Sequence, residues 1–357
     1  MVISRRSSHS GLPRVVLNAV ALTEGGSGVQ TYVRELVAAV ANRVPELDLG
    51  ISAIVDQSQV KNVPNGIPVH AVRAQSGVTR KVQSALPVRD AELVHGLDVD
   101  IPWSGRQRRV ATVHDLAQLD MPWAFSGGGR TKRALTRFAC RNADELIAVS
   151  AFTAERIQAH FGREATVVYE APGAVFRPAT PEAVEALRKR FQLPDRCVLY
   201  VGNFEPRKDL TSLREACRLA ATQLVVAGGA IDSIDLGPGV MRLGYIQETD
   251  LPALYGAATV VAYVSHYEGF GLPPVEALAC DAVVMATKVG ALAEVCPSGI
   301  EFVPIGDATA QAAVVKELLN DADRRAERVV AGRAEVAKLS WVRAATETAD
   351  VWARALG

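Results

Sequence analysis

Short apolar runs recur along the whole chain, separated by longer stretches in which apolar residues recur at helical spacing. The runs are rich in valine, isoleucine and leucine, as is typical of strands buried on both faces of a sheet. In the first half of the chain the predicted strands are residues 15–20, 49–55, 110–113, 146–149 and 166–169. In the second half they are residues 197–201, 223–227, 240–243, 258–264 and 282–286.

Helical segments are predicted between these strands, including residues 29–42 and 129–143, and again at the C-terminus. Strands that alternate with helices predict parallel sheets with crossover helices. The alternation runs twice and is interrupted by a proline-rich segment, residues 172–181, which predicts a linker. The predicted fold class is therefore α/β, with two Rossmann-like doubly wound domains, residues 1–175 and 176–340.

Composition narrows the class of protein. The 357 residues include 39 basic and 39 acidic side chains, so no net field attracts nucleic acid or an anionic membrane. Five scattered cysteines lack the spacing of a metal site and fit a reducing compartment. The N-terminal residues lack the apolar segment of a secretory signal, and no stretch approaches the ~20 apolar residues of a membrane span. The prediction is a cytoplasmic enzyme.

The most informative segment is YEGFGLPPVEALA, residues 267–279. It follows a predicted strand, and its prolines open a predicted helix, whose first amides would bind an anion. Gly269 and Gly271 allow a ligand to approach the backbone closely. An ordinary strand-to-helix turn would not need the two carboxylates, Glu268 and Glu276, that flank the loop. The helix amides would bind phosphate, and the two carboxylates would accept hydrogen bonds from hydroxyl groups. Because a nucleotide sugar carries both kinds of group, the segment predicts a nucleotide-sugar site.

Two further candidates end predicted strands. Arg207 and Lys208 follow the strand at residues 197–201, and ligands of doubly wound sheets bind at this carboxyl edge. Both side chains suit diphosphate oxygens. His114, followed by Asp115, ends the strand at residues 110–113. A single histidine in this place is either structural or a hydrogen-bond partner for a sugar hydroxyl.

Other motifs are weaker. Gly25, Gly26 and Gly28 open a helix, but they lack the GxGxxG spacing of a dinucleotide site and fit a glycine turn facing an interdomain cleft equally well. Asp98 and Asp100 form a DxD tripeptide that could hold a divalent metal, a pattern that also occurs often by chance.

One predicted helix carries a row of basic residues. A solvated face is the favoured interpretation, with an anionic acceptor or a peripheral membrane contact as the alternative. The residues are Arg130, Lys132, Arg133, Arg137 and Arg141.

Taken together, these residues resemble the retaining glycosyltransferases of family 4, which have the GT-B fold, and in particular their mannosyltransferase-like group. Glu268 and Glu276 look like the paired-glutamate signature of the family, and EPRKDL like its donor-phosphate segment. The runs VHDL, AVSAFTAERI and VGALAEV also match its usual patterns. The resemblance implies two domains facing across a cleft, an acceptor-binding and a donor-binding domain, with a C-terminal helix, residues 341–357, that crosses back to the first.

The resemblance also implies roles for individual residues. Arg207 and Lys208 would hold the diphosphate, and Glu276 would accept hydrogen bonds from the ribose. Glu268 and the amides of Phe270, Gly271 and Leu272 would address the transferred sugar and the phosphate. The remaining donor-site positions would be His114 near the sugar, Gly26 and Gly28 from the first domain, Tyr245 and Ile246 near the base, and Asn203, where many members carry another arginine.

The implied reaction is transfer of a hexose from a nucleoside diphosphate sugar, GDP-mannose or a UDP-sugar, to an acceptor hydroxyl. It would proceed by same-face displacement with retention, without a metal or other cofactor. A lipid-linked glycan, a small metabolite and a natural-product aglycone all remain open as acceptors. The alternatives are a pseudo-glycosyltransferase, a sugar-nucleotide epimerase and a non-catalytic nucleotide-sugar-binding protein.

Overall fold

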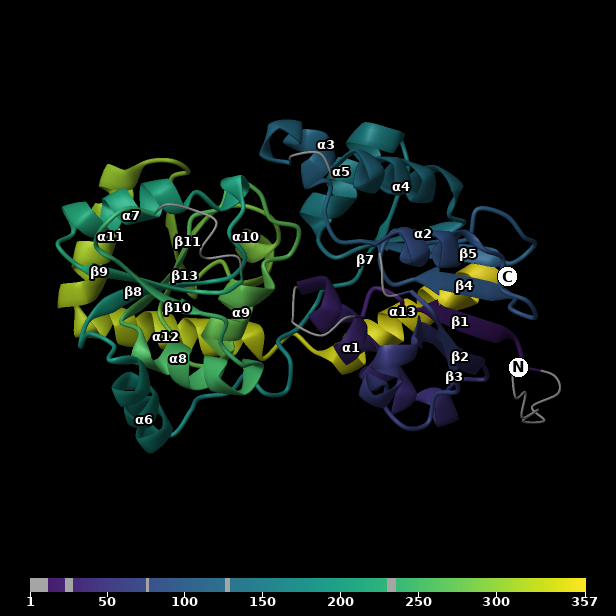
Figure 1. Ribbon diagram of the computed structural model, residues 1–357, viewed down its shortest axis with the longest axis horizontal. Helices are drawn as coiled ribbons and strands as arrows, with labels where there is room; N and C mark the ends of the chain where they lie inside the picture. The colour runs from purple at the N-terminus through teal and green to yellow at the C-terminus, as the bar shows by residue number, and fades with distance from the viewer. Residues whose placement is uncertain (1–11, 23–27, 75–76, 126–128, 230–235) are drawn as a thin grey trace.

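The computed structural model describes residues 12–22, 28–74, 77–125, 129–229 and 236–357. Two α/β domains lie side by side, each built on its own sheet (Figure 1). No helix or strand occupies residues 168–180, the stretch that contains most of the predicted linker. The fold class predicted from the sequence is confirmed, because both sheets are parallel and carry crossover helices.

The first domain contains a seven-stranded sheet in the order β3-β2-β1-β4-β5-β6-β7. Its strands are β1 (Arg14–Asn18), β2 (Gly50–Asp56), β3 (Val69–Val72), β4 (Leu93–Gly96), β5 (Arg108–Val113), β6 (Glu145–Ala148) and β7 (Thr166–Val167). Its helices are α1 (Gly28–Ala41), α2 (Gly77–Ala85), α3 (Ala117–Asp120), α4 (Gly129–Asn142) and α5 (Ala151–Phe161).

The second domain contains a six-stranded sheet in the order β10-β9-β8-β11-β12-β13. Its strands are β8 (Cys197–Val201), β9 (Gln223–Ala227), β10 (Val240–Gly244), β11 (Val260–Tyr263), β12 (Val284–Thr287) and β13 (Ile300–Val303). Its helices are α6 (Pro181–Phe191), α7 (Leu210–Leu219), α8 (Leu251–Ala257), α9 (Leu272–Ala279), α10 (Leu292–Val295), α11 (Ala308–Asn320) and α12 (Ala322–Val336).

Strand order reverses between β1 and β4 in the first sheet and between β8 and β11 in the second. In open parallel sheets, ligands bind at such a reversal, beyond the carboxyl ends of the strands. The loop after β5 contacts the loop after β11, since the Leu116 amide donates to the Tyr267 hydroxyl at 3.3 Å. The carboxyl edges of the two sheets therefore face each other across the domain boundary.

The last helix, α13 (Trp341–Leu356), leaves the second domain and packs on the first (Figure 1). Trp352 is fully buried in the same apolar cluster as Leu17 and Leu36. Its indole N–H donates to Nδ1 of His95 at 3.1 Å. Burial lowers the pKa of His95 to about 3, so the ring is neutral and able to accept this bond. The C-terminal helix is thus part of the first domain's core.

Three strands were not predicted. β3 and β13 are partly exposed and mix polar with apolar residues, and β4 is interrupted by His95. Nevertheless β4 is buried throughout, because Nε2 of His95 pairs with the Thr112 hydroxyl at 2.9 Å and its other nitrogen pairs with Trp352. The pattern of apolar residues could not predict a strand here, because the hydrogen-bond partners that allow His95 to be buried lie in β5 and α13.

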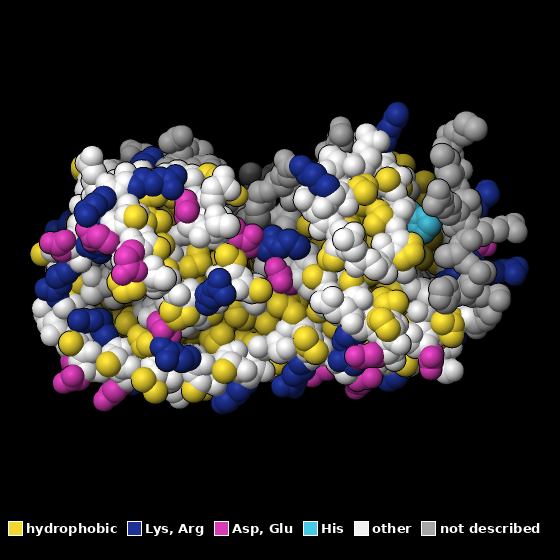
Figure 2. Space-filling view, turned by 90° about the horizontal axis from the view of Figure 1, so that it is seen from below, with side chains coloured by type: hydrophobic (Ala, Val, Ile, Leu, Met, Phe, Trp, Pro, Cys, Tyr) yellow, Lys and Arg dark blue, Asp and Glu magenta, His cyan; other side chains and the backbone are white. Residues whose placement is uncertain are grey.

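Acidic and basic side chains are interspersed over the face shown in Figure 2. This mixture accords with the equal numbers of the two kinds in the sequence. Within the described part of the chain, no helix has the length and apolar character needed to cross a membrane.

Candidate active site

The loop between β11 and α9 turns sharply at Gly271, which caps α9 with φ 96° and ψ 53°. A side chain here would be strained by the left-handed backbone, and its Cβ would lie 2.9 Å from the Leu292 side chain. Pro273 and Pro274 lie in the first turn of α9, where a missing N–H removes no helical hydrogen bond. Helix α9 therefore begins immediately after the loop.

Glu268 is the centre of a buried ion cluster at the edge of the second sheet. Its carboxylate accepts hydrogen bonds from Arg207 at 3.1 Å, from Ser265 at 2.7 Å and from the Lys208 ammonium. Arg207 also donates to the Tyr267 carbonyl at 2.7 Å. The two cations follow β8 and Glu268 follows β11, so they meet where the strand order reverses.

Electrostatics keep this cluster ionised. Burial would raise the pKa of Glu268, but Lys208 and Arg207 outweigh it and hold the pKa at about 2. The pKa of Arg207 is raised above its ordinary value: burial acts to lower it, and Glu268 and Glu205 more than compensate. The side chains of the two cations are only 12% and 13% exposed, and low exposure to water strengthens the interaction of a cation with an anion.

Backbone amides complete the anion site. Within the part of the chain that the structure describes, the amides of Phe270 and Gly271 have no hydrogen-bond acceptor. They lie at the positive end of α9. A Cβ built on Gly28, the first residue of α1, would lie 3.7 Å from the Leu272 side chain, so the first domain closes over this end of the loop. Gly26 lies outside the described residues.

Glu276 occupies a different environment from Glu268. It is the fifth residue of α9, and it is only 7% exposed. Burial, with the nearby Glu248, raises the pKa of Glu276 to about 8, although Arg34 acts in the opposite direction. The carboxyl group is thus protonated at neutral pH. A ligand that donates hydrogen bonds to it would favour the ionised form and lower this pKa.

His114 is held by the first domain at both ring nitrogens. Nδ1 lies 3.1 Å from the Glu170 carboxylate and Nε2 lies 2.9 Å from the Leu97 carbonyl oxygen. The carbonyl oxygen can only accept, so Nε2 carries a proton. Burial raises the pKa of Glu170 despite its contact with His114. Burial would lower the pKa of His114, but the Glu170 contact more than offsets it and the pKa is raised. A direct bond from a ring nitrogen to a sugar hydroxyl, as expected from the sequence, would require one of these contacts to be exchanged.

The remaining predicted positions surround the second sheet's edge. Asn203 is exposed after β8, and its side-chain oxygen would lie 3.5 Å from a Cβ on Gly229. Tyr245 is 57% exposed after β10, whereas Ile246 is buried. The structure therefore brings Arg207, Lys208 and Glu268 into direct contact. It places Tyr245 and Ile246 after β10, which is separated from β8 by β9.

The DxD carboxylates are occupied by cations from two helices. Asp100 accepts from Arg80 of α2 at 2.6 Å, and Asp98 accepts from Lys132 of α4. Among the described residues, no cluster of acidic, histidine or cysteine side chains has the arrangement of a metal site. Lys132 is therefore an ion-pair partner and not part of a freely solvated basic face.

Sequence reasoning missed Glu170, which orients His114, and Arg34, which pairs with Glu248 across the domain boundary at 2.5 Å. Glu170 follows the short β7, and Arg34 lies mid-helix in α1. No local motif marks either residue. Their partners are more than fifty residues away in the sequence, so only the folded chain reveals them.

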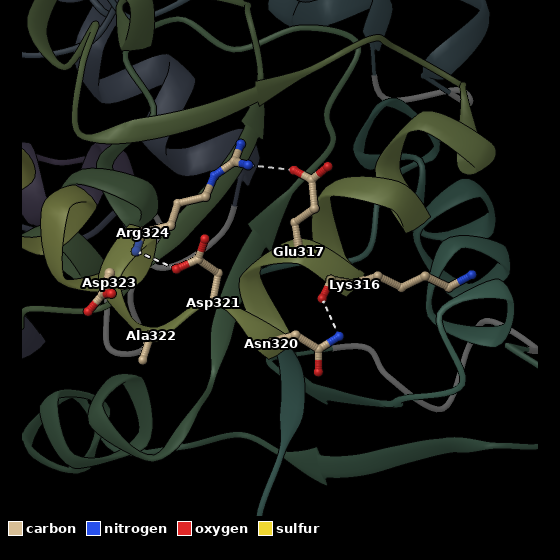
Figure 3. A pocket seen from close by; sticks show the side chains of 7 residues that line it. All are labelled: Lys316, Glu317, Asn320, Asp321, Ala322, Asp323 and Arg324. Atoms are coloured by element: carbon tan, nitrogen blue, oxygen red, sulfur yellow. Dashed lines mark hydrogen bonds and ion pairs between the residues drawn. The ribbon is translucent and has the colours of Figure 1, made fainter.

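An open hollow of about 650 Å³ lies between α11 and α12 (Figure 3). Its polar side chains form hydrogen bonds and an ion pair within and between these two helices. Asp321 accepts from the Arg324 amide at 2.8 Å, and the Arg324 guanidinium pairs with Glu317 at 2.5 Å. Asn320 donates to the Lys316 carbonyl at 2.9 Å. Capping and ion pairing account for these residues, which leaves the sheet edge as the candidate site.

Comparison with known proteins follows the same division into two domains. Residues 27–173 match the family model for the Glycosyl transferase 4-like domain, and residues 184–335 match the model for Glycosyl transferases group 1. The chain is 27% identical over 365 residues to O-antigen chain mannosyltransferase B of Escherichia coli, covering 91% of this chain and 96% of that protein.

A second relative is a GDP-mannose-dependent monoacylated alpha-(1-6)-phosphatidylinositol monomannoside mannosyltransferase of Corynebacterium glutamicum. It is 26% identical over 353 residues, which cover 88% of this chain and 91% of that protein. Among solved structures, sucrose-phosphate synthase from Thermosynechococcus elongatus superposes with a TM-score of 0.75 at 23% identity, covering 96% of this chain and 98% of that chain.

The two family models together cover every strand of the two sheets except β1, and the relatives match over most of their own length. Glu268 and the two basic residues that suggested the family lie together at the reversal point of the second sheet, and Glu276 lies in the helix that follows the same loop. The chain belongs to the family 4 glycosyltransferases, enzymes of the GT-B fold that transfer sugars.

Proposed function

We propose that this glycosyltransferase moves a hexose from a nucleoside diphosphate sugar to an acceptor hydroxyl with retention of anomeric configuration. The observation that carries the proposal is the meeting of Arg207, Lys208 and the loop amides at one sheet edge. Cations and amides at the same sheet edge would stabilise a diphosphate as it leaves. Glu276, buried beside this space, would accept the ribose hydroxyls.

GDP-mannose is the first donor to test, ahead of UDP-sugars. The relative from Corynebacterium glutamicum is named as GDP-mannose-dependent, and the one from Escherichia coli as a mannosyltransferase. Tyr245 and Ile246, at the end of β10, offer an exposed ring and an apolar side chain beside which the base would lie.

The reaction would be a same-face displacement. A double displacement needs a carboxylate free to attack the anomeric carbon. Glu268 is bound to Arg207, Lys208 and Ser265, and Glu276 lies in α9 with its pKa raised, so neither is poised as a nucleophile. The acceptor hydroxyl would attack as the diphosphate departs, and a donor phosphate oxygen would take its proton.

We also propose that the reaction needs no divalent metal. Negative charge grows on the leaving diphosphate in the transition state, and Arg207, Lys208 and the end of α9 supply positive charge to that group. Asp98 and Asp100, the one DxD tripeptide weighed as a metal ligand, form ion pairs with Lys132 and Arg80 instead.

The test combines binding and turnover. Thermal shifts are measured with GDP, UDP, ADP and dTDP, with and without magnesium, and with Glu276→Gln as the matched variant. A ligand that binds only the native state raises its melting temperature. We expect a shift with GDP or UDP in chelator that Glu276→Gln reduces.

Turnover then uses the sugar form of that nucleotide with candidate acceptors, and NMR of the product's anomeric configuration. Inverted product, or complete loss of rate in chelator, contradicts the proposal. Conversion of the donor alone identifies an epimerase. Binding without turnover of any donor favours a non-catalytic nucleotide-sugar-binding protein.

A further inference from the structure

The N-terminal end of α5, in the first domain, forms hydrogen bonds with two parts of the second domain. The amides of Ala151 and Phe152 donate to the Glu294 carboxylate at 3.0 and 2.8 Å. One residue earlier, the Ser150 hydroxyl donates to the Gly269 carbonyl oxygen at 2.8 Å. Gly269 lies between Glu268 and Phe270, inside the candidate donor loop. A single helix end therefore reaches both α10 and the loop that would hold the diphosphate.

Ser150 is fully buried and performs two tasks. Its oxygen accepts from the Thr153 amide at 2.9 Å, which caps α5. The hydroxyl also lies 3.0 Å from the Thr153 hydroxyl and 2.8 Å from the Gly269 carbonyl oxygen. A carbonyl oxygen can only accept whereas a hydroxyl can donate, so the Ser150 proton goes to Gly269 and Thr153 donates to Ser150. The hydroxyl is therefore held by its own helix while it binds the loop of the other domain.

This contact fixes one particular peptide unit. The Gly269 carbonyl and the Phe270 N–H belong to the same planar trans peptide and point in opposite directions. Anchoring the carbonyl on Ser150 turns the Phe270 N–H away from the first domain. Among the described residues this N–H has no acceptor, which leaves it available to a ligand.

The fit at Gly269 is tight enough to hold the peptide in place. A Cβ on Gly269 would lie 1.8 Å from the His114 carbonyl oxygen and 3.2 Å from Cβ of Asp115. Only glycine allows the two backbones to come this close. The loop is thus pressed against the first domain on one side and bonded to Ser150 on the other.

We propose that Ser150 is a positioning residue for sugar transfer: it orients the Gly269–Phe270 peptide so that the Phe270 N–H completes the diphosphate site when the two domains meet. This inference rests on the proposed function. Because the anchor belongs to the other domain, separation of the domains removes it. The anion site is then incomplete, which protects the bound donor from reaction with water while the cleft is open.

The test compares Ser150→Gly with the wild-type enzyme. Glycine is an acceptable helix N-cap but has no hydroxyl to donate to Gly269. Charge on the diphosphate grows mainly in the transition state, so loss of an oriented donor falls on kcat more than on ground-state binding. We expect kcat to fall by about tenfold to a hundredfold, with the Kd for the nucleoside diphosphate changed by less than about threefold.

Thr180→Gly is the control, because it removes the N-cap of α6, whose hydroxyl accepts from the Ala183 amide, without touching the donor loop. It should leave kcat unchanged. If Ser150→Gly does not fold, Ser150→Ala carries the same comparison. Unchanged kcat in a folded Ser150 variant, or an equal loss in Thr180→Gly, overturns the inference. If the wild-type enzyme transfers no sugar from any donor, the proposed function has failed instead.

Discussion

At the scale of single residues, the two glutamates of the loop are held in opposite states of charge. Glu268 is bound by two cations, and its pKa lies at about 2. Glu276 is buried beside other carboxylates, and its pKa lies at about 8. A pair of carboxylates with divided pKa values indicates a division of roles. Glu268 holds the two basic side chains through hydrogen bonds. Under the proposed function, Glu276 accepts hydrogen bonds from the ribose hydroxyls.

Glu276→Gln should stabilise the unliganded protein at alkaline pH. The unfolded chain loses this proton near the ordinary pKa of 4.5, whereas the folded chain keeps it up to about 8, so wild-type stability falls as pH rises between these values. Each pKa unit corresponds to about 1.4 kcal/mol. Denaturant unfolding should show equal stabilities of variant and wild type near pH 4 and a more stable variant at pH 8.

The same substitution should weaken nucleotide binding by about tenfold, because a neutral amide accepts ribose hydroxyls less strongly than a carboxylate. Wild-type affinity should also rise between pH 6.5 and 8.5, as ribose binding competes with the proton. Calorimetric titration of both proteins with the nucleotide across this range measures how the affinity changes with pH. A pH-independent wild-type affinity would contradict the assignment of Glu276 to the ribose.

Glu268→Gln should destabilise the protein by about 3 kcal/mol, since it leaves Arg207 and Lys208 largely buried without their shared carboxylate. Inorganic pyrophosphate should restore part of this loss by binding the two cations. Chemical denaturation with and without pyrophosphate measures both effects. Glu205→Gln is the control, because the Glu205 side chain is 36% exposed and pairs with Arg207 alone. Equal responses of the two variants would argue against an anion site at Lys208.

At the scale of elements, the fit of the loop after β11 against the loop after β5 controls how the domains meet. Gly269→Ala would drive a Cβ to within 1.8 Å of the His114 carbonyl oxygen, a backbone atom that cannot swing aside. We expect the domains to separate and kcat to fall by about a hundredfold, since displacement by about 1 Å is enough for such a loss. Small-angle scattering should show a larger radius of gyration.

Nucleotide binding should persist in Gly269→Ala, because the cations and Glu276 belong to the second domain alone. Gly50→Ala, where a Cβ meets nothing closer than 3.5 Å, is the matched control and should resemble the wild type. A fully active Gly269→Ala enzyme would show that this contact is not needed for catalysis.

Elements of the second domain were predicted well from the sequence because β8, β9, β11 and β12 are continuous apolar runs. Their loops carry Arg207, Lys208 and Glu268, so this part of the site followed from strand ends. The contacts of His114 with Glu170 and of Ser150 with Gly269 could not be predicted in this way. They join residues 56 and 119 positions apart. The first contact depends on the order of strands within the first sheet, and the second depends on how the two sheets face each other.

At the scale of the whole molecule, α13 joins the two domains through its packing on the first. Trp352→Ala would leave a cavity at a fully buried position and remove the hydrogen bond to His95. We expect a loss of about 3–5 kcal/mol in the first domain. Trp123→Ala, at a side chain that is 65% exposed, should change stability by less than about 0.5 kcal/mol. Hydrogen exchange resolved by segment should locate the loss in β1 and β4, and an equal loss in β8 and β11 would contradict it.

The position of α13 also bears on how the chain is made. Domains usually fold in the order in which the ribosome releases them. Here the core of the first domain includes Trp341 and Trp352, which are synthesised after every strand and helix of the second domain. The second domain, whose strands and helices end at Val336, can be complete while the first still exposes an apolar surface. A nascent chain that stalls before Trp341 would present that surface to chaperones and proteases, although its second domain is already complete.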